Sequence, residues 1–111
     1  MSIYRLDAVE YGHIDARYIQ SVDLTITNAG AEEFDVLIHG YHLYGVYYVG
    51  LVHVGAGSTV FVPNITNHNT AFSLLLVTNI NYTHSTLITV HAKNQGQLGA
   101  VYSNSDFQAI E

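Results

Sequence analysis

Cysteine is absent from this 111-residue chain, so neither disulfide bonds nor thiolate metal sites can stabilise its fold. Basic residues are scarce as well, because three lysines and arginines stand against nine acidic residues, for a formal net charge of -6. That sign is wrong for gripping a phosphate backbone, and no nucleic-acid partner is expected. Charged residues make up only 11% of the chain and apolar residues 49%, which excludes a disordered chain.

Long hydrophobic runs are also missing. The apolar stretches are far shorter than the roughly twenty residues that cross a bilayer, so no membrane partner is expected. The opening residues MSIYRLDAVE do not follow the basic-then-apolar order of a secretory signal. We therefore expect a soluble chain that is made in the cytoplasm, with enough residues for one hydrophobic core.

Short runs of β-branched and aromatic residues do recur, about every ten residues, between glycine, asparagine or proline breaks. Within one such run Val22, Leu24 and Ile26 alternate with polar residues, which is typical of a strand with one buried face. The expected strands lie near residues 22–28, 34–39, 44–54, 59–63, 72–79, 85–92, 100–103 and 107–110, with 44–54 as one strand or two, and Pro63 closing its strand. This spacing predicts an all-β, jelly-roll-like β-sandwich of about eight strands with an N-terminal extension.

The first eighteen residues stand apart from that pattern. Ser2–Glu10 alternates like a strand, and a mixed, glycine-containing stretch follows it to Tyr18. We predict a connector or donor strand over residues 1–18 and the sandwich core domain over 19–111. The detached strand can pair with its own domain as an edge strand, or with the edge of a neighbouring copy.

Seven histidines are the obvious candidates for chemistry, yet no supporting carboxylate follows His39 and His42 at the spacing of the cupin metal motif. The chain also has neither a G-x-S-x-G elbow nor a pair of carboxylates whose spacing suggests acid–base work. We therefore predict no catalytic, cofactor-binding or metal-binding residue, no cofactor and no enzymatic activity.

Tyrosine is in excess, with nine in the chain and a cluster at Tyr41, Tyr44, Tyr47 and Tyr48. Tyrosine is enriched at protein interfaces and offers sugars a flat apolar face. Ordinary cross-strand pairing on a sheet face explains the cluster equally well. The sequence leaves both interpretations open.

Six phrases in order, VDLTITNAG, FDVLIHG, HVGAGSTVFVP, FSLLLVTN, STLITVHAKNQG and AVYS, resemble the core of the bacillus endospore appendage subunits. The resemblance covers about Gln20 to Ser103. It implies a small jelly-roll subunit that stacks into fibres on the spore surface, with its N-terminal connector docked into a neighbouring subunit. Known members cross-link these connectors through cysteines, so this chain resembles a cysteine-free branch.

Carried over to this chain, the resemblance makes Ser2–Glu10 the donated strand. The interface residues that it implies are Ile3, Tyr4, Leu6, Ala8 and Val9, and the hinge residues are Tyr11 and Gly12.

Two functions follow from these observations. The leading hypothesis is a structural subunit of an extracellular spore-surface fibre or pilus, which self-assembles into a helical homopolymer by donor-strand complementation. Its partners are copies of itself, with a fibre anchor or tip protein as a further partner. The alternative is a jelly-roll module of a phage or spore surface that binds a carbohydrate or receptor as a closed trimer.

Overall fold

Most segments in which apolar and polar residues alternate form β-strands. The computed structural model describes residues 1–80 and 85–110. The strands are β1 (Ser2–Ala8), β2 (Ser21–Asn28), β3 (Phe34–His42), β4 (Gly45–Val54), β5 (Thr59–Thr66), β6 (Phe72–Thr78), β7 (Thr86–Asn94), β8 (Gln97–Ser103) and β9 (Gln108–Ala109). Two short 3₁₀ turns, η1 (Ala16–Tyr18) and η2 (Asn104–Asp106), are the helical elements of the described part.

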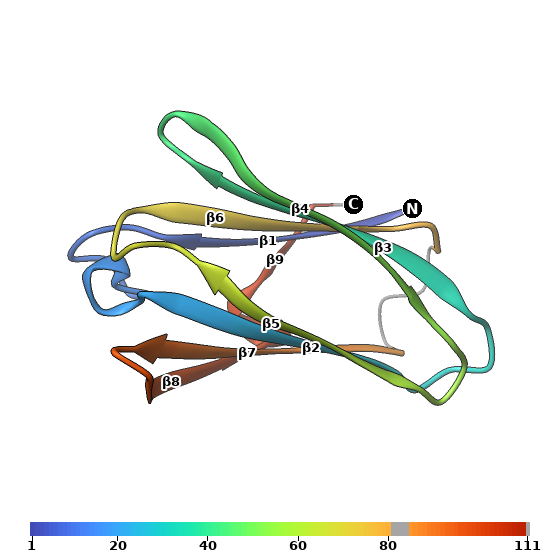
Figure 1. Cartoon of the computed structure of the whole chain (residues 1–111). Coiled ribbons are helices and arrows are strands. Elements are labelled where there is room, and N and C mark those ends of the chain that lie inside the picture. Colours follow the sequence, from blue (N-terminus) through green and yellow to red (C-terminus); the bar gives the residue numbers. More distant parts are fainter. Residues whose placement is uncertain (81–84, 111) are drawn as a thin grey trace.

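The strands form two sheets that face each other (Figure 1). One sheet has five strands in the order β4-β3-β6-β1-β9, and the other has four in the order β5-β2-β7-β8. The ladders between these strands are antiparallel, and the chain passes repeatedly from one sheet to the other. This arrangement confirms the predicted all-β, jelly-roll-like sandwich. No helix in the described residues has the length and apolar character needed to span a membrane.

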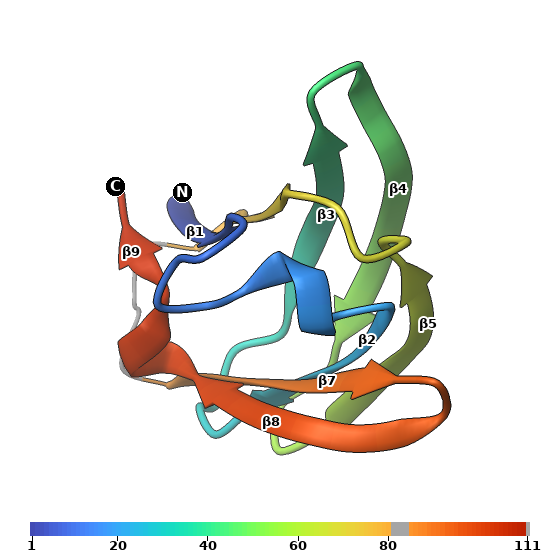
Figure 2. The same ribbon diagram turned by 90° about the vertical axis from the view of Figure 1, so that its left-hand side faces the viewer.

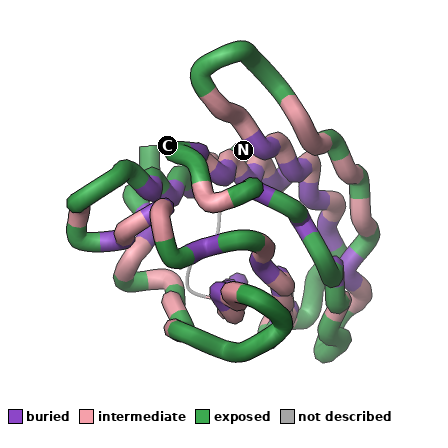
Figure 3. Tube along the Cα trace, turned by 60° about the vertical axis from the view of Figure 1, so that its left-hand side comes forward, coloured by how far each residue is buried: buried purple, intermediate pink, exposed green. Residues whose placement is uncertain are grey.

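The core fills the space between the two sheets. On β2, Val22, Leu24 and Ile26 are fully buried, and the intervening residues lie on the outer face. Figure 3 shows the same alternation along the neighbouring strands, and an exposed tip on the hairpin that joins β3 to β4. Each fully buried leucine or isoleucine is worth roughly 1.5–3 kcal/mol relative to an exposed one, so single truncations in this layer are measurable.

Strand β1 lies inside the five-stranded sheet of its own chain. It pairs with β6 from Ser2 opposite Thr78 to Ala8 opposite Phe72, and with β9 at two positions on its other side. Its side chains Tyr4, Leu6 and Ala8 are buried in the common core. Within this single chain, β1 therefore shares one core with the strands that follow residue 18, and the division into connector and core domain stays a prediction.

The structure corrects the predicted end of the fifth strand. Pro63 does not close β5, which continues to Thr66. The register shifts between Val22 and Leu24 on β2, so Pro63 and Asn64 lie in a bulge opposite Asp23. Because β5 is also the edge of its sheet, the missing N–H of Pro63 is tolerated there.

Residues 45–54 form one continuous strand. The alternative of two strands meeting at a corner is therefore excluded. Gly45 adopts a φ of 117° at the start of β4, where the hairpin turns. That hairpin extends beyond the body of the sandwich, as the end-on view in Figure 2 shows.

Candidate functional site

One row of the outer face of the five-stranded sheet is apolar across the whole width of the sheet. The register of the ladders places one outward residue of each strand in the same row. Beyond the paired positions of β1 and β9, Ile110 donates its N–H to the Ile3 carbonyl at 2.8 Å, so Ile110 lies beside Ile3 and completes the row. In order across the sheet the row is Leu51, Leu37, Val77, Ile3 and Ile110. We call this set the apolar row.

The edge strand β4 adds a column of exposed apolar side chains to this face. Val46, Val49 and Leu51 are 49%, 62% and 71% exposed, and all three lie on the outer side of the strand. Leu75, next to Val77 on β6, extends the same surface towards the hairpin. A single exposed apolar residue is ordinary, whereas a connected set is less common on a small protein.

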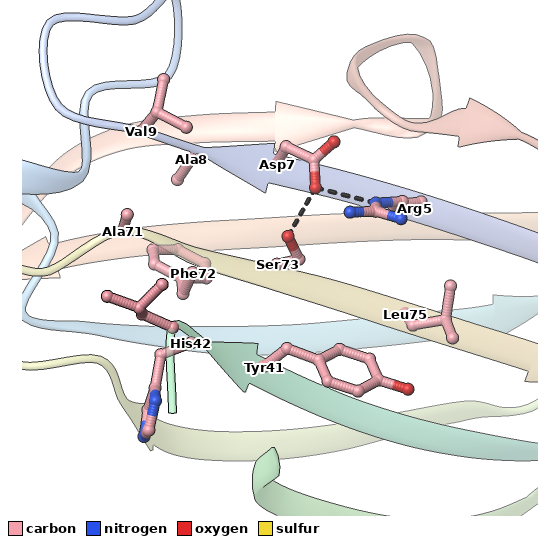
Figure 4. Close-up of a pocket in the computed structure, with 11 residues that line it drawn as sticks. Arg5, Asp7, Ala8, Val9, Tyr41, His42, Ala71, Phe72, Ser73 and Leu75 are labelled. Carbon is pink, nitrogen blue, oxygen red and sulfur yellow. Dashed lines mark hydrogen bonds and ion pairs between the residues drawn. The ribbon is translucent and has the colours of Figure 1, made fainter. Parts of the chain in front are cut away.

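A hollow with a volume of about 670 Å³ lies at one end of this face (Figure 4). Tyr41, Phe72 and Leu75 are among the residues that line it, and Leu43 lines it from the hairpin. An ordered polar group lies beside them, because Asp7 accepts hydrogen bonds from Ser73 at 2.5 Å and from Arg5 Nε at 2.9 Å.

The carboxylate of Asp7 is held in its charged form. Partial burial raises its pKa, but the hydrogen bonds from Ser73 and Arg5 and the charge of Arg5 outweigh burial and lower the pKa below its usual value. A carboxylate of lowered pKa is a weak base, so it does not activate the Ser73 hydroxyl that it accepts from. The hollow therefore suits an apolar side chain of a partner better than a nucleophilic reaction.

Strand β4 is the longest edge strand of the two sheets. In the described residues it pairs only with β3, and its ten residues include no proline and no charged residue apart from His53. The other edge strands are shorter, since β9 has two residues, β8 has seven and β5 has eight with Pro63 among them. The β3–β4 ladder has a bulge at Gly40, as the β2–β5 and β7–β8 ladders have theirs. A long, mostly apolar edge strand can pair with a further strand.

A second hollow, of about 410 Å³, lies between the β3–β4 hairpin and the end of β5. The register shift at Gly40 leaves Tyr47 as an extra residue on β4, and its ring packs where a Cβ on Gly40 would lie. The Tyr47 hydroxyl donates to the amide oxygen of the buried Asn67, and burial raises the pKa of Tyr47. His42 stacks on Tyr47 with ring centroids 5.2 Å apart.

The second hollow is also lined by amide, hydroxyl and imidazole groups. Asn64, Thr66 and Thr70 line it together with His68. Asn64 and His68 have φ values of 58° and 55°, in the left-handed region that few side chains other than asparagine and aspartate adopt readily. Aromatic rings together with a few neutral polar groups are the features of a site for a small uncharged ligand.

The histidines are dispersed over the fold. In the part of the chain that the structure describes, no three histidine, aspartate or glutamate side chains gather in a way that could hold a metal ion. His39 and His42 contact tyrosines, and His53 contacts Asp35 at 2.7 Å on the surface. His84 lies outside the described residues.

The predicted interface and hinge residues fall into two groups. Tyr4, Leu6 and Ala8 point into the core, whereas Ile3 lies on the outer side of β1 and Val9, which follows the strand, is exposed and lines the first hollow. Whether these side chains also serve a neighbouring copy stays a prediction.

The hinge residues belong to an ordered turn. Tyr11 has a φ of 61°, and the Arg17 guanidinium lies 3.7 Å from its ring centroid. A Cβ on Gly12 would come within 2.5 Å of a methyl group of Val9. Arg17 also hydrogen-bonds Asp15 at 2.6 Å, which lowers the pKa of Asp15 to about 2.

Sequence analysis missed the outward column of β4. A signal was present, because the run YGVYYVGLVHV is apolar at nearly every position and therefore marks a strand that is apolar on both faces. The side that would remain uncovered depends on the topology, which the run does not reveal.

The chain was compared with known protein families, proteins and structures. No protein-family model, curated protein or solved structure matches the chain.

Proposed function

We propose that this protein is a structural subunit that assembles with copies of itself into a fibre through β-strand pairing. The observation that carries the proposal is the edge of β4: this ten-residue strand pairs with β3 on one side and with no other strand of the described residues on the other, and it exposes Val46, Val49 and Leu51. Backbone hydrogen bonds would supply affinity, and the alternate side chains would supply specificity. A contact between different surfaces of two copies leaves both ends open and so produces a filament.

The small number of charged residues supports the proposal that much of the surface is covered by neighbouring copies in the assembly. Only 11% of the residues are charged, and several large apolar side chains are more than half exposed in the single chain. The extracellular, spore-surface location belongs to this proposal as well, and its support is the resemblance to the endospore appendage subunits. Immunogold labelling of intact spores is the test of that location.

Strand donation is the specific route that we propose for this pairing. β1 would leave its place beside β6 and enter the same place in a neighbouring copy, with Tyr11 and Gly12 as the hinge. The short β9 supports this route, because it pairs with β1 at only two positions and leaves one side of β1 lightly held. The cost is the temporary exposure of Tyr4, Leu6 and Ala8, which fill the core.

The first experiment is negative-stain electron microscopy of the purified full-length protein. Long regular fibres are the expected result, and discrete monomers or closed trimers at all concentrations would contradict the proposal.

An engineered disulfide separates strand donation from simple edge pairing. Asp7 and Ser73 lie directly opposite each other and point outward, and the native chain has no competing cysteine. The double variant Asp7→Cys, Ser73→Cys should hold β1 in its own sheet when oxidised. Fibres that form only under reducing conditions support donation, whereas fibres under both conditions show that β1 is not exchanged. The Asp7→Ser, Ser73→Ala variant is the control for loss of the native hydrogen bond.

A second function, the binding of a neutral sugar, is supported by the second hollow. Its volume of about 410 Å³ lies in the range of small-molecule sites, and its lining includes Tyr48, Asn64 and Thr70 but no carboxylate or ammonium group. Titration of the ¹⁵N-labelled protein with glucose, galactose and N-acetylglucosamine tests it. Amide shifts confined to this hollow and abolished by Tyr48→Ala support binding; their absence with all three sugars refutes it.

A further inference from the structure

We infer that the outer face of the five-stranded sheet is an interface, and that it is covered by the same face of a second copy of this chain. The inference rests on the proposed function in one respect, since it takes the partner to be another copy. It concerns the sheet face, however, and the proposed function concerns the strand edge. The two can therefore fail separately.

The contrast with the opposite side of the sandwich singles out this face. The outer face of the four-stranded sheet is mostly threonine and other polar residues. In the paired positions these are Thr59, Thr27 and Leu87, then Phe61, Thr25, Thr89 and Ser103, then Asp23, His91 and Val101. An antiparallel sheet ordinarily has one such solvated face. The outer face of the five-stranded sheet also has polar residues, such as His39 and Arg5, but its apolar row crosses from Leu51 to Ile110 without one.

Charge favours a second copy as the occupant. Two proteins of net charge -6 repel each other unless they meet at a neutral patch. The charged side chains in the rows next to the apolar row are Arg5 and Asp35. Arg5 forms an ion pair with Asp7 at 2.9 Å, and Asp35 one with His53 at 2.7 Å. Asp7 and Asp35 thus each have a basic partner on this face, which reduces the repulsion between two copies that meet here.

The face is also large enough. Five strands about 4.8 Å apart and about seven residues of 3.3 Å each give a patch of roughly 24 by 23 Å, or about 550 Å². Two such patches bury about 1,100 Å² in total, slightly above the roughly 1,000 Å² that a specific interface needs. Since an apolar row on one copy complements the same row on another, a two-fold arrangement requires no further partner.

Sedimentation velocity with a matched pair of variants tests the inference. Leu75→Glu places a charge at the centre of the apolar face, beside Arg5, where the single chain can accommodate it. Thr25→Glu makes the corresponding change on β2, the matching interior strand of the polar face. We expect dimers of the wild type and of Thr25→Glu, and at least tenfold weaker dimerisation of Leu75→Glu.

Equal dimerisation of both variants, or a wild type that is monomeric throughout, would overturn the inference. Val77→Thr, which keeps the side-chain shape, replaces Leu75→Glu if circular dichroism shows that the latter is unfolded. Electron microscopy of the same samples separates the two proposals. Wild-type dimers without fibres remove the proposed function and keep this interface, whereas fibres with undiminished Leu75→Glu dimers do the opposite.

Discussion

The two sheets of this sandwich differ on the sides that face away from the core. The outer side of the four-stranded sheet has threonines such as Thr25, Thr27 and Thr89 at its centre, and their hydroxyl groups make this side polar. The outer side of the five-stranded sheet has Leu37, Leu75 and Val77 at its centre. Both sheets bury their inner sides in the same core, so core packing does not require this difference. The proposed interface rests on this difference.

The largest effect should come from an inner residue of β1, which tests whether this strand belongs to the core. Leu6 is 1% exposed, and Leu6→Ala should lower the free energy of unfolding by about 2–5 kcal/mol through lost burial and a residual cavity. Ile3→Ala, on the outer side of the same strand, should cost only a fraction of that in the monomer. Chemical denaturation measures both, and equal losses would contradict the sidedness of β1.

The next effect concerns the buried Asn28, at the end of β2. Its amide donates to the Glu32 carbonyl at 2.6 Å, and its side-chain oxygen accepts the N–H of Gly30 at 2.9 Å. Asn28→Ala should leave these backbone groups without partners and lower the free energy of unfolding by about 1–3 kcal/mol. Asn79→Ala is a more exposed comparison, because Asn79 accepts one bond, from the Asp35 N–H. A thermal melt in which Asn79→Ala is the less stable variant would contradict this ranking.

A smaller effect is expected when the polar face is made to resemble the apolar one. The double variant Thr25→Val, Thr89→Val joins Phe61 in a short apolar row across β5, β2 and β7. Its stability should stay near that of wild type, because valine suits an exposed strand. Its self-association, measured by sedimentation, should increase. If association is unchanged, apolar content alone does not explain the difference between the two faces.

The smallest effect is a pH dependence at the edge of the apolar face. The hydrogen bond of His53 to Asp35 and the nearby charge of Glu33 raise the pKa of His53 above 6.5, although desolvation opposes this. A raised pKa contributes stability that is fully present below about pH 6.5 and is lost as the pH rises through the folded-state value. As the pH rises from about 6.5 through the folded-state pKa of His53, the melting temperature of wild type should therefore fall slightly more than that of His53→Gln. Parallel pH profiles of the two proteins would show that the pair contributes nothing.

Sequence periodicity predicted the inner layer well. Alternation in Val22–Ile26 and the break before β5 are local signals, and they lead directly to strands, turns and a sandwich. The bulge that holds Pro63 was not predictable, because it depends on the register with β2 and on the edge position of β5. The outer row was not predictable either, because its five residues come from strands that become neighbours only through the topology.

The hollows show the same limit. The cluster of tyrosines is visible in the sequence, but the contact of Tyr47 with Asn67 joins residues twenty positions apart. The register shift at Gly40 determines that contact by turning Tyr47 inward. The sequence pattern therefore identified the tyrosine-rich segment but not Asn67 as the residue that Tyr47 contacts.

The bond between Ile110 and Ile3 places the two ends of the described chain side by side. A short linker could join them, and new ends could be opened at the exposed turn between β4 and β5. Such a circular permutant would keep every strand in its place while tethering β1 at both of its ends. In such a variant, β1 could no longer leave its own sheet to pair with a neighbouring copy.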